Sequence, residues 1–324
     1  MPVLGIESSA HTLGIGIVEN GKVIANERLM YNITDKGIIP ARVADFHAGN
    51  VKKALTRALN SADLRMGDID AVGYTKGPGL GACLEVAQVA AKSLSGRYKV
   101  PIFPVNHAVA HIEIVKSVSG MKDPLAVYVS GGNSQILGIS EEPYRHYHIY
   151  GETFDIGIGN MLDTFARAAK LNPAWGSTVA KSALGGKYIQ MPYTVKGMDF
   201  TFTGLLTNAI GLLERNGLKD VSYSLQETAF SMLCEATERA MLLTRKRELA
   251  LCGGVAQSDR LKEMLKAVSK SHGVLFGVAP NEFNADNGAM IAIVAERMLE
   301  MGIKVRKSEC TVSQKYRIDK IRLV

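Results

Sequence analysis

The sequence has few cysteines, and their spacing gives them no shared role. Cys83, Cys234, Cys252 and Cys310 lie far apart, and no two of them form a CxxC pair. A disulfide framework or a zinc ribbon requires cysteines at short, regular spacing. We therefore expect four scattered, reduced thiols and no cysteine zinc site.

Long hydrophobic runs are also absent. No apolar stretch reaches the ~18 residues that a membrane span requires. The first residues, MPVLGIESSA, lack the basic segment and the long apolar core of a signal peptide. We therefore expect a cytoplasmic protein with no membrane partner.

Common nucleic-acid motifs are missing as well. The chain has no aromatic signature of an RNA-recognition motif, no C2H2 zinc-finger spacing and no long basic run. Its 38 Lys and Arg residues nevertheless exceed its 31 Asp and Glu residues, which gives a net charge of +7. This excess attracts polyanions. Taken alone, the charge is better explained by an ordinary basic surface, so a role with nucleic acid needs other support.

What the sequence does contain is one pattern that occurs twice. Near residue 3 and again near residue 125, an apolar strand, a turn of small residues, a second strand, a turn and a third strand follow one another. Alternating strands and helices come after each opening. Helical periodicity extends over residues 41–62, 83–98, 106–118, 160–171, 203–216, 224–246, 258–272 and 286–302.

This doubled pattern predicts two α/β domains, residues 1–121 and 122–324. Each would present a glycine-rich hairpin to a shared nucleotide cleft, which is the design of actin-like ATPases, the class of sugar kinases, Hsp70 and actin. Free backbone N–H groups in such turns can hold phosphates.

The stretch NHAVAHIEI contains the clearest candidate for chemistry. His107 and His111 are four residues apart, so on a helix both imidazoles lie on one face and can reach one metal ion. Two packed histidines without a metal are the simpler explanation. A metal site needs further ligands, and the best candidates are Asp286, just before a predicted helix, and the phenol of Tyr128.

A metalloprotease site is the least favoured interpretation of this histidine pair. The HExxH motif needs a glutamate directly after the first histidine as general base, but this position is Ala108. Glu113 follows His111 by two residues and would point away from the shared helical face. The sequence therefore argues against peptide hydrolysis.

Three glycine turns are candidates for nucleotide binding. One is the turn Val129, Ser130, Gly131, Gly132; the others are residues 157–160, before a helix, and residues 253–255, after a strand. Glycine next to a helix N-terminus makes a ready anion site. Asp163, one turn into a helix, could bond a ribose hydroxyl or a metal, although an acid in the first turn commonly only stabilises the helix dipole. Glu7 and His11 lie at the first hairpin, where position alone gives them no role.

Together these segments resemble a known family. GIESSAHTLGIGIV, NHAVAHIEI, VYVSGGNSQIL, GETFDIGIGNMLDTFAR, VKGMDFTFTGLL, SLQETAF, LCGGVA and ADNGAM are similar, in order, to the blocks of the tRNA N6-adenosine threonylcarbamoyltransferases. The archaeal and eukaryotic branch, the catalytic subunit of the KEOPS complex, is the most similar. This family was once described as a sialoglycoprotein endopeptidase.

The resemblance implies an actin-like fold and a defined reaction. The threonylcarbamoyl group of threonylcarbamoyl-AMP would be transferred to N6 of adenosine 37 in tRNAs that read ANN codons. The implied metal is iron or zinc, and its ligands would be His107, His111, Tyr128 and Asp286. The nucleotide, of the ATP or AMP type, would contact residues of the glycine turns and their neighbours: Tyr128, Val129, Ser130, Gly131, Gly132, Asp163, Gly176, Gly254 and Ser258. Glu7 and His11 are the candidates for a catalytic role.

The resemblance also implies partners. These are tRNA and three KEOPS subunits, namely a small protein kinase, a kinase-binding subunit and a small dimerising subunit. In some archaea the kinase is fused to the C-terminus of the catalytic subunit. A nucleotide-binding, ATP-hydrolysing scaffold that assembles with the kinase is the alternative to the transferase.

The chain departs from the family in the nucleoside site. Where the family has PGGP followed by a glutamate, this chain reads PAWGSTVAK, with Trp175 in place of a glycine and Ala180 at the glutamate position. Ser258 replaces an asparagine. Because two polar contacts are replaced, we expect a working site that holds its nucleotide loosely.

Overall fold

The structure is a computed structural model that describes residues 1–32, 37–141 and 145–323. Its backbone divides into two compact units. Unit 1 comprises residues 1–118, 141–146 and 285–324, and unit 2 comprises residues 119–140 and 147–284. No helix in the described part of the chain is long and apolar enough to cross a membrane.

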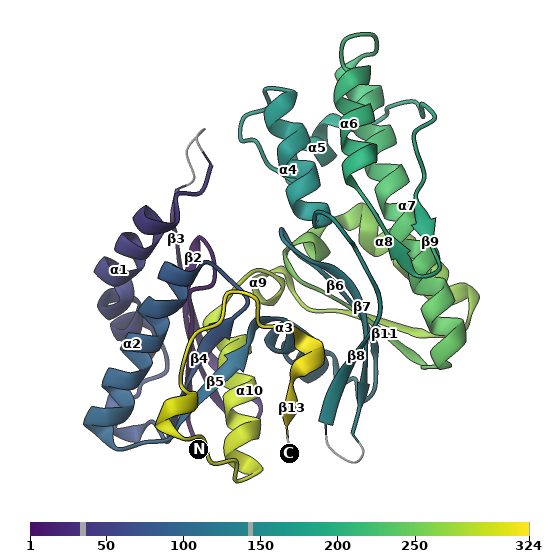
Figure 1. The fold of residues 1–324 in the computed structure, drawn as a ribbon. Helices are drawn as coiled ribbons and strands as arrows, with labels where there is room; N and C mark the ends of the chain where they lie inside the picture. Colours follow the sequence, from purple (N-terminus) through teal and green to yellow (C-terminus); the bar gives the residue numbers. More distant parts are fainter. Residues whose placement is uncertain (33–36, 142–144, 324) are drawn as a thin grey trace. The chain divides into compact units, whose positions relative to one another are not determined.

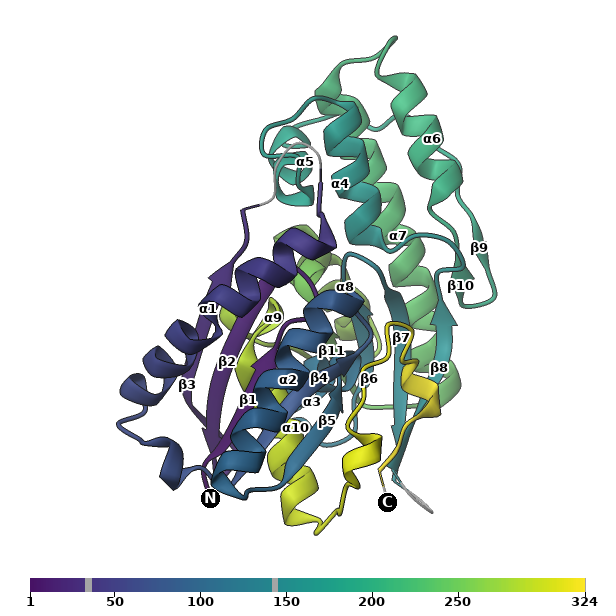
Figure 2. The same ribbon diagram turned by 60° about the vertical axis from the view of Figure 1, so that its left-hand side comes forward.

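Unit 1 is built on a five-stranded sheet with the order β3-β2-β1-β4-β5. Its strands are β1 (Val3–Glu7), β2 (Thr12–Glu19), β3 (Lys22–Met30), β4 (Ala71–Gly77) and β5 (Ile102–Asn106). The first three are antiparallel neighbours, whereas β4 and β5 run parallel to β1. Figure 1 and Figure 2 show α1 (Pro40–Ser61) and α2 (Gly81–Tyr98) on one face of this sheet and α10 (Gly288–Glu300) on the other.

Unit 2 repeats this topology. Its strands are β6 (Leu125–Val129), β7 (Ser134–Ser140), β8 (Arg145–Glu152), β11 (Glu248–Cys252) and β12 (Leu275–Val278), in the order β8-β7-β6-β11-β12. The first two residues of β8 belong to unit 1, where they pair antiparallel with the short edge strand β13 (Arg322–Leu323). Read in chain order within each unit, both sheets run third, second, first, fourth, fifth. β6 pairs antiparallel with β7 and parallel with β11. The predicted duplication and the actin-like fold class are therefore confirmed.

The helices of unit 2 enclose its larger hydrophobic core. They are α4 (Ile158–Ala168), α5 (Gly176–Ser182), α6 (Thr203–Leu212), α7 (Leu218–Thr244), α8 (Asp259–Ser271) and the short α9 (Asn281–Asn284). Figure 1 shows α4, α5 and α6 beside the long α7. A small hairpin of β9 (Val195–Lys196) and β10 (Asp199–Phe200) packs on α7. Phe165, Phe200, Phe202 and Phe230 are fully buried in this core.

Most predicted helices lie close to the observed ones, but some of their ends differ. The helix expected from residue 224 begins at Leu218, because Gly217 ends the preceding turn in an extended conformation. The helix predicted over residues 106–118 corresponds to α3 (His107–Ser119). The expected ranges 1–121 and 122–324 divide the chain at one point, whereas the compact units do not, since α10 packs on the sheet of unit 1.

The packing of α10 depends on a row of glycines across the sheet. Gly16 of β2, Gly5 of β1 and Gly73 of β4 are neighbours in register. A Cβ atom at Gly16 would lie 2.1 Å from the Ala289 nitrogen, and one at Gly5 would lie 2.3 Å from the Ala292 nitrogen. The helix backbone therefore rests directly on the strand backbone, a distance that only glycine permits.

Replacing Gly16 with alanine tests this contact. The new methyl group would force the helix away from the sheet, so we expect a destabilisation of about 1–3 kcal/mol or more, as for other overpacked cores. Gly49→Ala is the matched control, because Gly49 lies exposed in α1 with open space around it. That change should stabilise the helix by roughly 0.5–1 kcal/mol. Urea unfolding followed by circular dichroism measures both, and equal midpoints for the two variants would contradict the close contact.

Candidate functional site

The first part of the candidate site is the start of α3. β5 ends at Asn106, whose side-chain oxygen accepts hydrogen bonds from the N–H groups of Ala108 (2.9 Å) and Val109 (3.2 Å). Asn106 therefore caps the N-terminus of the helix, which begins at His107. His107 and His111 then lie one turn apart, with ring centroids separated by 4.7 Å. The predicted shared face is confirmed.

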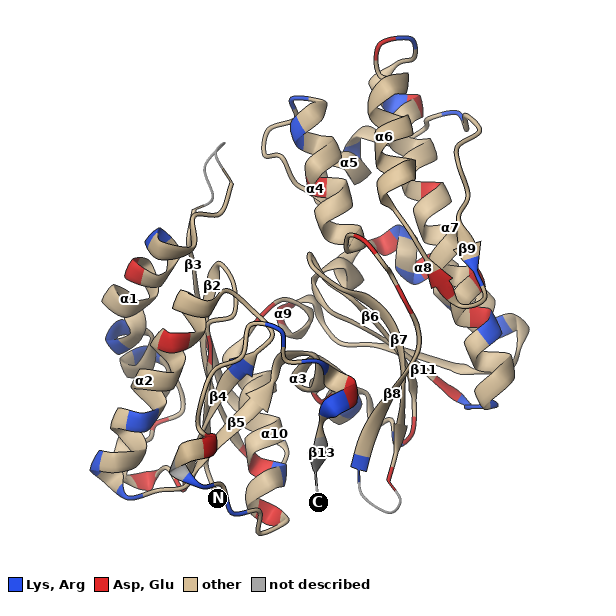
Figure 3. Ribbon diagram, viewed as in Figure 1, with Lys and Arg blue, Asp and Glu red and all other residues tan. Residues whose placement is uncertain are grey.

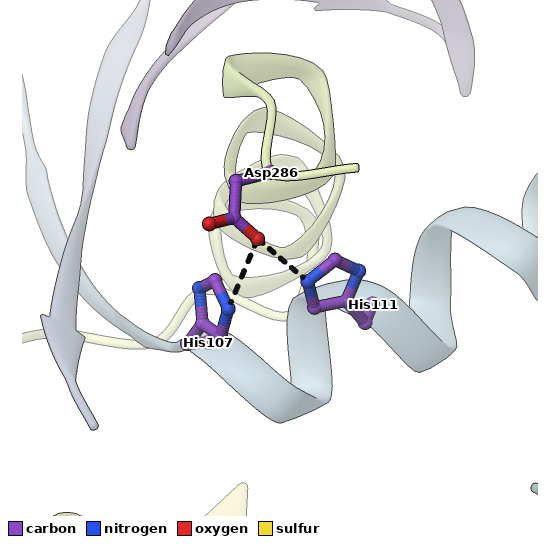
Figure 4. Close-up of side chains that lie close together, drawn as sticks. All are labelled: His107, His111 and Asp286. Atoms are coloured by element: carbon purple, nitrogen blue, oxygen red, sulfur yellow. Dashed lines mark hydrogen bonds and ion pairs between the residues drawn. The ribbon is translucent and has the colours of Figure 1, made fainter. Parts of the chain in front are cut away.

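Asp286 joins the two histidines from another part of unit 1. Its Oδ1 atom lies 3.4 Å from Nε2 of His107 and 3.3 Å from Nε2 of His111 (Figure 4). Asp286 comes two residues before α10, so the docking of that helix on the glycine row brings the carboxylate to α3. Three of the four predicted metal ligands therefore meet, although 175 residues separate His111 from Asp286.

Glu7 fixes the orientation of His107. Its Oε2 atom lies 3.0 Å from Nδ1 of His107 and accepts a 2.6 Å hydrogen bond from the Thr75 hydroxyl. The other carboxylate oxygen accepts from the Ser9 N–H. Glu7 is completely buried. A carboxylate in this place keeps the proton of a neutral His107 on Nδ1, so the lone pair of Nε2 points toward Asp286.

These contacts are compatible with a cation site. With the proton of each neutral imidazole on Nδ1, the lone pairs of two imidazoles and one carboxylate face one another, and a bound cation would balance them. With the proton on Nε2, the same histidine donates a hydrogen bond to Asp286. Donor atoms bound tetrahedrally to one ion at about 2.0–2.1 Å lie about 3.4 Å from one another, and the two contacts to Asp286 are 3.3 and 3.4 Å. The group of His107, His111 and Asp286 could therefore hold a metal ion.

The protonation states favour the same conclusion. Burial opposes ionisation of Asp286, but the two adjacent histidines hold the pKa of its carboxyl well below its usual range. Burial also lowers the pKa of His111, against the opposing effect of Asp286. A deprotonated carboxylate and a neutral imidazole are the forms that bind metal.

Glu113 does not belong to this group. It is buried on another face of α3, where its carboxylate contacts the guanidinium groups of Arg145 and Arg297 and lies 3.9 Å from Nζ of Lys116. A carboxylate held by these cations is a poor general base. The structure thus agrees with the sequence in giving the histidine pair no protease-like glutamate.

The remaining predicted residues of this region are placed differently. Tyr128 is a buried residue of β6 in unit 2, so its role as a fourth ligand stays a prediction. His11 lies in the turn between β1 and β2, where its carbonyl accepts from the Tyr31 N–H (2.9 Å). Sequence reasoning missed Ser9 and Thr75, since no spacing links Thr75 to a glutamate 68 residues away.

In unit 2, the three glycine turns meet at the carboxyl ends of β6 and β11. A Cβ atom at Gly157 would lie 2.4 Å from the Gly131 oxygen, and one at Gly253 would lie 2.3 Å from the Val129 oxygen. The N–H of Asn160 donates to the Gly131 carbonyl (3.0 Å). Gly132 and Gly131 remain exposed. The backbone is therefore accessible where the turn after β6 meets the N-terminus of α4.

The other residues that we predict to contact the nucleotide lie in segments that follow these turns in the sequence. Asp163 of α4 accepts a 2.7 Å hydrogen bond from the N–H of Gly176, the first residue of α5. Trp175 precedes Gly176 and is 40% exposed. Gly254 opens a short 3-10 helix, Gly254–Gln257, after β11. Ser258 caps α8, where its hydroxyl accepts from the Leu261 N–H (3.4 Å).

Comparison with known proteins identifies the family. The family model described as tRNA N6-adenosine threonylcarbamoyltransferase matches residues 21–293. A protein of that name from Thermococcus sibiricus is 46% identical over 326 residues, covering 100% of this chain and 99% of the relative. A second, from Thermococcus gammatolerans, is 47% identical over 324 residues, covering 99% of this chain and 98% of the relative. The chain belongs to the tRNA N6-adenosine threonylcarbamoyltransferase family.

Another relative of this chain is longer. A probable bifunctional tRNA threonylcarbamoyladenosine biosynthesis protein of Methanothermobacter thermautotrophicus is 42% identical over 324 residues, which are 99% of this chain and 60% of that protein. Among solved structures, two HypF chains match with TM-scores of 0.62 and 0.64 at 15% and 12% identity. The transferase covers about half of each HypF chain, and this likeness supports the fold alone.

The contact between Glu7 and His107 generates a prediction. Glu7→Gln keeps the shape of the side chain but removes the charge that holds the imidazole proton on Nδ1. Loss of such an outer partner weakens metal binding by about 10–100-fold. Chelator competition with the purified chain measures this affinity. Glu27→Gln is the control for charge, because Glu27 is a half-buried residue of β3 whose carboxylate accepts a hydrogen bond from the Ser61 hydroxyl (3.2 Å). Equal metal affinities for all three proteins would contradict the orienting role of Glu7.

Proposed function

We propose that this chain transfers the threonylcarbamoyl group from threonylcarbamoyl-AMP to N6 of adenosine 37 in tRNAs that read ANN codons. The observation that carries this proposal is the match over the whole chain to proteins named tRNA N6-adenosine threonylcarbamoyltransferase. The N6 amine attacks the carbamoyl carbon, the bond from that carbon to the phosphate oxygen breaks, AMP leaves, and N6 loses one proton. Since tRNA is the substrate, we place the chain in the cytoplasm.

The residues of unit 1 support a metal in this reaction. We assign His107, His111 and Asp286 as ligands of one iron or zinc ion, with Tyr128 as the fourth. Such an ion, when bound, polarises a carbonyl or phosphoryl oxygen as a Lewis acid. Glu7 orients His107, so its part is to position a ligand. We leave His11 as the candidate for contact with the reacting groups, because it lies in the adjoining turn with a partly exposed side chain.

The residues of unit 2 support binding of an AMP-type nucleotide. The exposed backbone of Ser130 to Gly132 would donate to phosphate oxygens, and the start of α4 adds the positive end of a helix dipole. Asp163, Gly176, Gly254 and Ser258 would surround the nucleoside. The exocyclic amine of adenosine is a weak nucleophile, so positioning it against the carbamoyl group contributes more than a strong base.

The proposed partners follow from the family. We propose that the chain works in a KEOPS complex with a small protein kinase, a kinase-binding subunit and a small dimerising subunit. The existence of a bifunctional relative that extends beyond the matched region supports a close association of this activity with a further one.

Transfer to tRNA is the direct test of this function. The purified chain is incubated with threonylcarbamoyl-AMP, unmodified tRNA and the KEOPS partners, and the digested nucleosides are analysed by mass spectrometry. We expect modified adenosine from the wild type and a loss of at least a hundredfold in His107→Ala/His111→Ala, because that variant lacks two ligands. No product from the wild type, with partners proven competent beside another catalytic subunit, would favour the ATP-hydrolysing scaffold.

Trp175 allows a separate test of the nucleotide site. It is the single tryptophan of the chain and directly precedes Gly176, so AMP bound near Gly176 should change the intrinsic fluorescence. We expect weak binding, and an affinity gain of about tenfold in Ala180→Glu, which restores a charged hydrogen-bonding group. Ser177→Glu, an exposed position of the same helix, is the control. Tight binding by the wild type, or equal gains in both variants, would contradict a site weakened at Ala180.

A further inference from the structure

A hollow lies in unit 2, at the opposite end of the parallel strands from the glycine turns. It has a volume of about 570 Å³, within the range of about 300–1,000 Å³ that is usual for ligand pockets. The residues before β6, the end of β7, the middle of β8 and the turn between α7 and β11 line it. The five residues of β6 span roughly 16 Å, so this hollow is distinct from the corner that we assign to the nucleotide.

Basic side chains dominate the hollow. Lys122, Arg245, Lys246 and Arg247 line it together with two acids, Asp123 and Glu248. Figure 3 shows Lys and Arg at the turn between α7 and β11. The excess of cations over acids in one hollow creates a local positive potential that attracts anions.

The two acids are already engaged. Asp123 contacts Nζ of Lys246, which also donates to the Ile139 carbonyl at 3.3 Å. Glu248 accepts from the backbone N–H groups of Lys122 (2.9 Å) and Asp123 (2.8 Å). These contacts fix the walls of the hollow and leave its acids little capacity to neutralise other cations.

Three cations therefore have no acidic partner. Within residues 1–32, 37–141 and 145–323, no ion pair involves Lys122, Arg245 or Arg247, and all three side chains are exposed. Like charges that gather without a counter-ion repel one another, and a bound polyanion would relieve this repulsion. Guanidinium groups bind phosphate oxygens through two parallel hydrogen bonds.

Two aromatic rings also line the hollow. They belong to His148 and Tyr150 of β8, with ring centroids 6.3 Å apart and an interplanar angle of 41°. The Tyr150 ring lies against Gly138, where a Cβ atom would come within 2.5 Å of it. Basic side chains and aromatic rings in one site are typical of sites for RNA strands, because phosphates meet the cations while bases stack on the rings.

We propose that this hollow binds the phosphate backbone of tRNA. Lys122, Arg245 and Arg247 contact successive phosphates, and the two aromatic rings offer a stacking surface to an unpaired base. The inference rests on the proposed function, which supplies tRNA as the substrate. It adds a docking surface remote from the nucleotide corner in unit 2, and it gives the positive net charge a specific location.

Charge removal at the hollow tests this proposal. Binding of a fluorescently labelled, unmodified tRNA transcript to the full chain is measured by anisotropy at several salt concentrations. Arg245→Gln/Arg247→Gln should weaken binding at least tenfold at low salt. It should also reduce the slope of log affinity against log salt by about 1.4–1.8, since each lost phosphate contact contributes about 0.7–0.9. The control is Lys52→Gln/Lys53→Gln, which removes the same charge from exposed positions of α1 and should leave the slope unchanged.

The outcomes separate this surface from the transferase activity. In the transfer assay, the arginine variant should raise the KM for tRNA and retain kcat at saturating tRNA. If the wild type binds tRNA through the hollow but transfers nothing, the proposed transferase function is wrong and the tRNA-binding surface is supported. Equal tRNA affinity in the wild type and the arginine variant, or no tRNA binding by the wild type at low salt, would overturn the surface. Inorganic pyrophosphate binding that is lost in the variant while tRNA binding persists would show a small-anion site instead, and would also overturn it.

Discussion

The contact on which the candidate active site depends is that of α10 with the glycine row of Gly16, Gly5 and Gly73. At Gly16 and Gly5 the strand backbone meets the helix backbone, and at Gly73 it meets the Ala295 side chain. This packing leaves no room for a further side chain, so the helix has one depth and one register on the sheet. Asp286 comes just before that helix, and its carboxylate therefore reaches the histidines of α3. The position of a ligand is thus set by the hydrophobic core of unit 1. Any change that lifts α10 should disturb the ligand group before it unfolds the chain.

Hydrogen bonds then orient the side chains that the packing of α10 brings together. Glu7 is held by Thr75 and Ser9, and it holds His107 in turn. Unit 2 uses close glycine contacts for another purpose, since they bring the ends of β6 and β11 and the start of α4 together and keep backbone N–H groups accessible. In the function that we propose, the duplicated topology would serve two kinds of chemistry: side-chain ligands in unit 1 and an exposed backbone in unit 2.

The sequence predicted the doubled architecture and the meeting of Asp286 with the two histidines because these features have strong local or repeated signals. Two hairpin openings of the same pattern imply two similar sheets, and a histidine pair at helical spacing implies a shared face. Asp286 was found because a carboxylate before a helix, beside glycine, is a recognisable pattern. Ser9 and Thr75 could not be found, because only the parallel pairing of β1 with β4 brings Thr75 to Glu7. The basic hollow was also invisible, since its residues come from four separate segments and include no long basic run.

X-ray absorption spectroscopy of the metal-loaded chain decides whether His107, His111 and Asp286 hold a metal ion. We expect one ion for each chain, with two imidazole ligands, oxygen donors and no sulfur, because all four cysteines are buried as free thiols. The Asp286→Ala variant should lose the ion or one oxygen donor. A sulfur ligand, or a spectrum with no imidazole, would show that these three side chains are not the ligands.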